Sequence, residues 1–195
     1  DDGAGGDVAA GDGIYTAMLP GQPANTLIAW AIAATDTASA TSRYPAAATS
    51  ECLVLTGQTQ PAGSLGVYRL WLTDANRNAW INREKMSNEP IEGTMVYGES
   101  RVIHGAGGRY RGSPFLRPRY NTPDGNQCGY VWTVPADEPF LGGDELNLDS
   151  LEPGAGGSER DETSLREATA FSLAEQLGLP FSHQRFIRLY VNGLS

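Results

Sequence analysis

The N-terminal part of the chain alternates short apolar runs with turn-forming residues. Runs of strand length cover residues 14–19, 27–35 and 52–55, and each predicts a β-strand. Proline, glycine, aspartate and small residues separate them, and these residue types favour turns. Short strands in this rhythm are typical of a β-sandwich. Three strands are too few to close a sandwich, so we expect further strands upstream.

The pattern changes after a polar segment rich in glutamine, proline and glycine. Residues 67–72 alternate like a strand, and Thr73 is placed to N-cap a helix over residues 74–83. A β-hairpin follows, with one arm at 94–97 and a second arm from residue 101. A run of glycines in the second arm, residues 105–108, predicts that this arm is interrupted.

The last third of the chain predicts two short strands, a helix and a final strand. The short strands cover residues 130–134 and the Leu146/Leu148 pair. Ser164 and Glu167 have the spacing of a capping box, and the helix they begin ends near Leu177 before Gly178 and Pro180. Its apolar positions, expected to pack on the strand at 185–191, are Ala170, Leu173, Ala174 and Leu177.

These elements predict an α+β chain made of two units. Residues 1–57 are interpreted as the C-terminal strands of a β-sandwich module, residues 58–65 as a linker, and residues 66–195 as an antiparallel sheet with a helix. Asn192-Gly193 is a strong hairpin-turn signal close to the end of the sequence. A hairpin turn without its return strand leads us to expect that the natural domain continues beyond Ser195.

The charge balance narrows the class of partner. The chain has a formal net charge of -9 at pH 7 and a single lysine, Lys85. Nucleic-acid binding needs a basic surface, so we expect no nucleic-acid partner. No apolar run approaches the length of a transmembrane helix, so we expect no membrane span. Composition and charge suit an exported protein.

Most common catalytic and metal-binding arrangements lack their residues here. The chain has two histidines, His104 and His183, and two cysteines, Cys52 and Cys128, all far apart in sequence. A hydrolase triad or a zinc site is therefore not predicted. The Asp/Gly-rich start, residues 1–13, has the oxygen ligands that calcium prefers, but the same residues form plain turns; both readings stay open.

The two cysteines also leave two readings open. In an oxidising compartment Cys52 and Cys128 can form a disulfide, which over so long a loop would stabilise the fold by about 4 kcal/mol. Alternatively, they are two unrelated buried thiols.

Four arginines in a very acidic chain form the most functional-looking cluster. They lie between residues 109 and 119, and Gly112 allows close backbone approach: Arg109, Arg111, Arg117 and Arg119. The planar guanidinium suits phosphate or carboxylate recognition. The alternative is that these arginines pair with the many carboxylates of the same protein.

The order of short motifs in the second half resembles the CotH-type kinase family, which is named for a spore-coat protein kinase. The segments that carry the resemblance are Arg111-Gly112-Ser113, residues 130–134, Leu146-Asn147-Leu148, Leu165-Arg166 and residues 186–193. Residues 1–57 resemble the closing strands of an Ig-like module that precedes such domains in exported bacterial proteins. The resemblance covers the N-terminal part of the kinase-like domain, from about Val67 to Ser195.

The resemblance implies a kinase-like N-terminal lobe that uses ATP with Mg²⁺ or Mn²⁺ to phosphorylate serine or threonine. The nucleotide-binding residues it implies are Arg111, Gly112, Ser113 and Arg166. The metal-binding acids and catalytic loop would follow beyond Ser195, so we assign no metal ligand or catalytic residue here and expect this chain alone to be inactive. One departure is Thr133, which stands near the position of a family lysine.

Two functional readings follow. The first is a fragment of an exported, ATP-dependent protein kinase-like transferase that acts on a protein substrate. The second is a non-catalytic binding or structural module, secreted or at the cell surface, that keeps the kinase-like fold and binds a cell-surface partner. Catalytic-loop acids downstream of Ser195 would favour the first reading.

Overall fold

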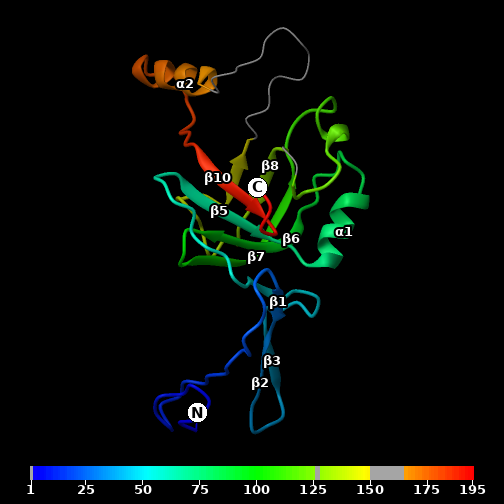
Figure 1. Ribbon diagram of the computed structural model, residues 1–195, viewed down its shortest axis with the longest axis vertical. Helices are drawn as coiled ribbons and strands as arrows, with labels where there is room; N and C mark the ends of the chain where they lie inside the picture. Colours follow the sequence, from blue (N-terminus) through cyan, green and yellow to red (C-terminus); the bar gives the residue numbers. More distant parts are fainter. Residues whose placement is uncertain (1, 126–127, 150–164) are drawn as a thin grey trace.

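A curled six-stranded sheet forms the body of the protein, in a computed structural model that describes residues 2–125, 128–149 and 165–195 (Figure 1). The strand order is β10-β5-β6-β7-β8-β9. The strands are β5 (Gly66–Trp71), β6 (Ile91–Tyr97), β7 (Arg101–Tyr110), β8 (Tyr130–Thr133), β9 (Glu145–Leu148) and β10 (Ile187–Val191). The chain is thus mixed α+β, mostly sheet, as expected. The sheet is not wholly antiparallel, because β10 runs parallel to β5.

The N-terminal strands form two small pairs and differ from the predicted strands. Residues 27–35 are not one strand but two, β1 (Leu27–Trp30) and β2 (Ile32–Thr35), which break at Ala31. β1 pairs with β4 (Cys52–Leu55), whereas β2 pairs with β3 (Thr41–Tyr44). The predicted strand at 14–19 is wrong: this segment is irregular and exposed, because no neighbouring strand offers it hydrogen bonds within the described residues.

The first strand pair packs on the large sheet, while the β2–β3 hairpin projects away from it (Figure 1). Leu53 and Leu55 of β4 share a buried cluster with Trp71 and Val96. The backbone N–H of Leu53 also donates to the hydroxyl of Thr94, at 3.3 Å. Residues 1–57 therefore contribute apolar contacts across the predicted linker, and the division of the chain at 58–65 stays a prediction.

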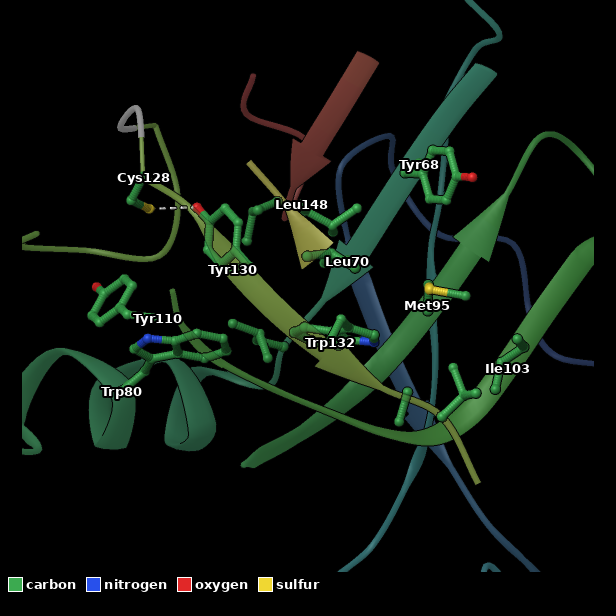
Figure 2. Packing of buried hydrophobic residues seen from close by; sticks show 14 of the residues in the cluster. Tyr68, Leu70, Trp80, Met95, Ile103, Tyr110, Cys128, Tyr130, Trp132 and Leu148 are labelled. Carbon is green, nitrogen blue, oxygen red and sulfur yellow. Dashed lines mark hydrogen bonds between the residues drawn. The ribbon is translucent and has the colours of Figure 1, made fainter. Parts of the chain in front are cut away.

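Aromatic side chains make up much of the main buried cluster (Figure 2). Helix α1 (Asp74–Asn82) begins as predicted, because the Thr73 hydroxyl accepts a hydrogen bond from the N–H of Asn76 at 3.1 Å. The helix buries Trp80, whose ring stacks on Trp132 of β8 with a centroid distance of 6.1 Å and an angle of 15°. Trp80 therefore joins the helix to the centre of the sheet.

The predicted interruption at residues 105–108 is wrong. The glycines instead allow a register shift and close packing of two indole rings. β7 runs unbroken from Arg101 to Tyr110 and pairs with β6 and then β8. Gly105 has a φ of 65° and lies near a shift in the β6–β7 register. Gly108 leaves room for the two stacked indoles, since an added Cβ would overlap Trp132 and lie 2.6 Å from Trp80.

Helix α2 (Arg166–Gln176) forms, but it does not pack as predicted. The helix has no buried residue, and Leu173 and Leu177 are 53% and 72% exposed. Its half-buried positions are Ala168, Phe171 and Ala174, and the helix lies to one side of the sheet (Figure 1). The Ser164 half of the predicted capping box lies outside the described residues, and Leu165 is the N-cap without a side-chain hydrogen bond.

The exposure of α2 makes Leu173→Ala a mild substitution. We expect it to change the free energy of unfolding by less than about 0.5 kcal/mol, because the substitution removes little buried apolar surface. Urea unfolding of wild type and variant measures this difference. A loss of about 2 kcal/mol or more, as for a core leucine, would show that the helix is buried against the protein.

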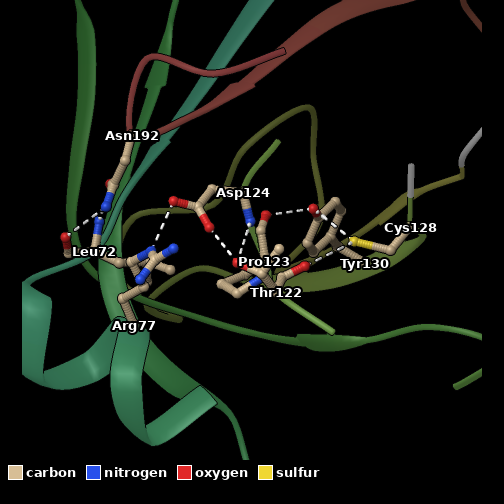
Figure 3. Close-up of polar contacts among 8 residues, drawn as sticks. All are labelled: Leu72, Arg77, Thr122, Pro123, Asp124, Cys128, Tyr130 and Asn192. Atoms are coloured by element: carbon tan, nitrogen blue, oxygen red, sulfur yellow. Dashed lines mark hydrogen bonds and ion pairs between the residues drawn. The ribbon is translucent and has the colours of Figure 1, made fainter. Parts of the chain in front are cut away.

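The end of β10 is tied to the sheet by Asn192 (Figure 3). Asn192 has a φ of 47° and begins the predicted turn, whose strand-end hydrogen bonds join Val191 and Leu194. Its side chain reaches across to Leu72, the residue after β5: Oδ1 accepts the N–H of Leu72 at 2.8 Å, and Nδ2 donates to the Leu72 carbonyl at 3.1 Å. The amide thus extends the β10–β5 pairing by one residue beyond the strand.

Both cysteines are buried thiols that are not joined to each other in the structure, as the second of the two interpretations expected. Cys52 lies on β4, opposite Trp30. The Sγ of Cys128 donates to the hydroxyl of Tyr130 at 2.8 Å, and that hydroxyl donates to the carbonyl of Pro123 at 2.5 Å (Figure 3). The thiols therefore serve separate local contacts.

A buried ion pair fixes the loop before β8 to helix α1. Asp124 is 7% exposed and pairs with Nε of Arg77 at 2.7 Å (Figure 3). Burial alone would raise the pKa of Asp124, but hydrogen bonds from Arg77 and Thr122 outweigh it, so the pKa lies below its ordinary value of 3.8. The pair therefore stabilises the fold above that pH and loses its effect as the pH falls through the lower folded pKa.

Asp124→Asn should consequently destabilise the protein in a pH-dependent way. We expect a loss of about 1.5–3 kcal/mol at pH 7, the usual range for hydrogen bonds to a charged group. The difference from wild type should shrink below about pH 3.8, where the wild-type carboxylate also takes up a proton. Urea unfolding at pH 7 and at pH 3 checks both points. Asp137→Asn, at an exposed loop residue, is the control, and an equal effect of both variants would contradict the account.

Candidate functional site

A cleft of about 310 Å³ lies where the two edge strands of the curled sheet approach each other. β9 contributes one side, the segment leading into β10 contributes the other, and the first turn of α2 closes one end. The lining residues are Tyr68, Leu141, Leu146, Asn147, Leu148, Asp149, Glu167, Ala168, His183, Gln184, Arg185, Phe186 and Ile187. A concave site that combines apolar side chains with a small number of polar groups is the usual form of a small-molecule site.

The charged groups of the cleft come from three separate segments. Asp149 follows β9 directly, Glu167 lies in the first turn of α2, and His183 and Arg185 precede β10. The rings of His183 and Phe181 form a T-shaped pair with a centroid distance of 4.9 Å. Carboxylates, an imidazole and a guanidinium thus face one space, which suits a ligand with both anionic and hydroxyl groups.

Arg111 reaches the rim of this cleft. Its backbone N–H donates to the Gly129 carbonyl at 2.8 Å, which extends the β7–β8 pairing past Tyr110. Its guanidinium forms an ion pair with Asp149. Of the sequence-predicted site residues, Arg111 therefore contacts a residue that lines the cleft, Asp149. The Asp149 carboxylate already neutralises part of the positive charge of Arg111.

Gly112 and Ser113 build the turn that follows β7 and do not line the cleft. Gly112 has a φ of 111°, and its carbonyl accepts from Nε of Arg117 at 2.9 Å. The Ser113 carbonyl accepts from the N–H groups of Leu116 and Arg117, and its hydroxyl accepts from the N–H of Phe115 at 3.3 Å. These groups hold the loop that leads into the short helix η1 (Arg117–Arg119).

Arg166 is the first residue of α2, next to the two helix residues that line the cleft, Glu167 and Ala168. The structure therefore brings the Arg111 and Arg166 segments toward the same cleft. It does not add Gly112 or Ser113 to that region.

The arginine cluster divides into different roles. Arg117 is 6% exposed and donates to the Met86 carbonyl at 3.1 Å and to Oδ1 of Asn88 at 2.9 Å, so it ties two loops together. Arg111 pairs with a carboxylate, as the second sequence reading expected for the cluster. Arg119 is exposed on η1. Arg111 thus pairs with a carboxylate of the same protein, as the alternative interpretation expected, whereas Arg117 binds carbonyl groups of a neighbouring loop.

Thr133, which stands near the expected lysine, has a local partner. Its hydroxyl donates to the Gly107 carbonyl at 3.1 Å, across the β7–β8 pair. The cleft receives its cations instead from Arg185 and, at the rim, from Arg111.

Sequence reasoning missed the residues that line the cleft. The sequence analysis selected neither His183 nor Asp149 as a site residue. The available signal was that both adjoin predicted strands, and strand ends often carry functional groups. What the pattern could not show was that β9 and β10, the two edges of the sheet, curl toward each other.

The residues that the structure describes contain no group of three or more histidine, cysteine, aspartate or glutamate side chains placed to hold a metal ion. In the Asp/Gly-rich start, the Asp7 carboxylate accepts the N–H groups of Asp2, Gly3 and Ala9. The Asp12 carboxylate likewise accepts the N–H of Ile14. These are the contacts of turns. Neither described helix has the length and apolar character needed to span a bilayer.

A scan against protein-family models finds no match for this chain, and a search of curated proteins finds none either. The function must therefore be argued from the cleft and from the motifs that surround it.

Proposed function

We propose that this chain is the N-terminal part of an exported CotH-like kinase domain, preceded by part of an Ig-like module, and that the cleft binds the phosphates of ATP. In the complete kinase domain the bound nucleotide would donate a phosphoryl group to a serine or threonine of a protein substrate, with Mg²⁺ or Mn²⁺.

The observation that carries the proposal is the convergence of separate motifs on one cleft. Leu146-Asn147-Leu148, the start of α2 and the beginning of the 186–193 segment each contribute lining residues. Arg111, from the Arg-Gly-Ser element, contacts Asp149 at the rim. Segments that are far apart in sequence and share a resemblance therefore meet at one cleft with the form of a ligand site.

The cleft residues fit a phosphate group better than a purely apolar ligand. The guanidinium of Arg185 is a strong donor to phosphate oxygens, and His183 adds a further nitrogen. Tyr68 and Phe186 offer aromatic surface beside these donors. Asp149 and Glu167 supply carboxylates of the kind that Mg²⁺ accepts. ATP would supply the transferred phosphoryl group, and the cleft side chains would bind and orient it.

The second candidate is a non-catalytic binding module at the cell surface or outside the cell. Two contacts favour it. Asp149 already neutralises Arg111. Thr133, which stands near the position of the expected phosphate-binding lysine, is hydrogen-bonded to the Gly107 carbonyl. On this reading the same cleft would bind a carboxylate or hydroxyl group of a partner protein.

Nucleotide binding by the purified chain separates the two candidates. We expect ATP with Mg²⁺ to bind in a saturable, salt-sensitive way, measured by isothermal titration calorimetry, and Arg185→Ala to weaken binding at least about tenfold. Arg101→Ala removes one exposed cation outside the cleft, in the Arg101–Glu138 pair, and should bind like wild type. Absence of binding, or equal weakening by both variants, would reject the nucleotide site and leave the binding module.

Incubation with labelled ATP, Mn²⁺ and a Ser/Thr-rich acceptor tests phosphoryl transfer itself. We expect no transfer by this chain, because a kinase also needs metal-binding carboxylates and a catalytic base. Transfer that copurifies with the chain and disappears in Arg111→Ala would show that this chain itself holds the catalytic acids, with Asp137, Glu138, Asp144 and Asp149 as candidates.

A further inference from the structure

A half-buried histidine lies where the first strand pair packs on the large sheet. Val96 of β6 and Val102 of β7 share an apolar cluster with β4. His104 follows Val102 by two residues in the same strand, so its side chain is on the same face of the sheet. The rings of His104 and Trp30 of β1 form a T-shaped pair with a centroid distance of 5.5 Å. His104 therefore contacts the N-terminal strands directly.

Two hydrogen bonds in series cross the same junction. The backbone N–H of Leu53 on β4 donates to the Thr94 hydroxyl oxygen at 3.3 Å, and this oxygen lies 3.3 Å from Nδ1 of His104. Thr94 has no exposed surface, so its hydroxyl hydrogen needs an acceptor within the protein. The unprotonated Nδ1 of a neutral imidazole is such an acceptor, whereas an imidazolium carries a hydrogen on both ring nitrogens.

The charges around the junction leave the neutral imidazole favoured. Glu138, in the loop after β8, is the charged group that acts on His104 among the described residues, and it also pairs with Arg101 at 3.3 Å. Burial lowers the pKa of His104 and outweighs the attraction of Glu138. Burial also raises the pKa of the Cys52 thiol on β4. The other titratable groups near Cys52 and Glu138 are Arg43 and Tyr44 of β3, Glu92 of β6 and Asp137 of the loop after β8.

We propose that His104 is a pH-sensitive contact, which holds the β1–β4 pair on the large sheet while its ring is neutral and releases the pair when the ring takes up a proton. Protonation would remove the acceptor of the buried Thr94 hydroxyl and place a charge beside Trp30. The element with two states is the β1–β4 pair, docked or released. A pair of strands is at best marginally stable alone in water, so release would also loosen its own hydrogen bonds.

The direction of the pH response follows from the ionisation of His104. The docked state favours the neutral ring, whose pKa there lies below the ordinary value of 6.5. Docking is therefore complete above that pH and weakens as the pH falls through the lower pKa of the docked state. Release would uncover Trp71 and Val96, which the strand pair now buries. None of the residues in this contact lines the cleft, so the response does not depend on nucleotide binding.

Amide hydrogen exchange of the full chain without nucleotide, at pH 7.5 and pH 5.0, tests the proposal. Exchange is expressed as protection factors, which correct for the intrinsic effect of pH. We expect the protection of β4 (Cys52–Leu55) at pH 5.0 to fall at least about threefold more than that of β6 (Ile91–Tyr97). Unchanged protection of β4, or an equal fall in both strands, would overturn the proposal.

Variants locate the effect at His104. His104→Asn stays neutral and keeps an amide oxygen as an acceptor for Thr94, so the selective loss of protection at pH 5.0 should disappear. His183→Asn removes the other histidine of the chain, which is exposed in the cleft, and should keep the loss. A loss of wild-type size in His104→Asn would contradict the proposal.

An NMR titration of the wild-type histidine rings does not require either variant to fold. The His104 ring should titrate with a pKa below 6.5, and its protonation should coincide with a change in the Leu53 amide signal. A pKa of 6.5 or higher for His104, or a Leu53 signal that does not follow it, would reject the switch.

Discussion

Gly108→Ala should destabilise the protein by at least about 3 kcal/mol, the upper part of the range for overpacked cores. The added methyl group would overlap the six-membered ring of Trp132 and lie 2.6 Å from Cη2 of Trp80. Both indoles are fully buried and stack on each other, so neither can move without disturbing the other. The backbone of Gly108 does not need a positive φ, so the clash alone causes the loss.

Thermal unfolding measures this effect directly. For a chain of this size, 3 kcal/mol corresponds to a fall in melting temperature of about 6–12 °C. Gly21→Ala is the matched control, because an added Cβ at Gly21 meets nothing within 4 Å and its φ is not in the left-handed region. A Gly108→Ala protein that melts with the Gly21→Ala control would show that the Trp80–Trp132 stack does not pass over Gly108 as described.

Asn192→Ala is expected to cost about 2–5 kcal/mol. Its side chain makes two hydrogen bonds to the backbone of Leu72, each worth about 0.5–1.5 kcal/mol net. Alanine also pays about 1–2 kcal/mol to adopt the left-handed conformation, since Asn192 has a φ of 47°. Without the amide, the link from β10 to the end of β5 is lost.

Asn192→Gly separates these two causes. Glycine adopts the left-handed conformation without strain, so the loss in this variant, about 1–3 kcal/mol, reports the two hydrogen bonds alone. Urea unfolding of both variants gives the comparison. If Asn192→Gly were as stable as wild type, the amide contacts to Leu72 would contribute nothing.

Local signals in the sequence predicted much of the second half of the fold. Thr73 predicted the start of α1, and the two strand-like arms at 94–97 and from residue 101 predicted the β6–β7 hairpin. Asn192-Gly193 gave the turn after β10, as the chemistry of left-handed residues requires. These features depend on neighbours within a few residues, which is why they are visible in sequence alone.

Long-range packing explains the errors. The glycines of β7 were interpreted as an interruption, because the sequence does not show that Trp80 and Trp132 occupy the space above Gly108. The Leu173 face of α2 has helical spacing, yet the half-buried face is that of Phe171. The parallel pairing of β10 with β5 joins residues about 120 positions apart, and no local pattern encodes it.

The candidate site was predicted only in part for the same reason. Arg111 and the start of α2 were identified from motifs, and both lie at the margin of the cleft. Gly112 and Ser113 instead shape a turn. His183, Arg185 and Asp149 became candidates only when the curled sheet brought β9 and the approach to β10 together.

The central claim is that ATP phosphates bind in this cleft, and amide chemical-shift mapping tests it most directly. Isotope-labelled chain is titrated with ATP and Mg²⁺, and shifts are followed residue by residue. The account predicts saturable shifts at Asp149, Glu167, His183, Arg185 and Ile187, with none in the β2–β3 hairpin. Saturable shifts that leave these cleft residues unchanged, or no shifts at millimolar ATP, would contradict it.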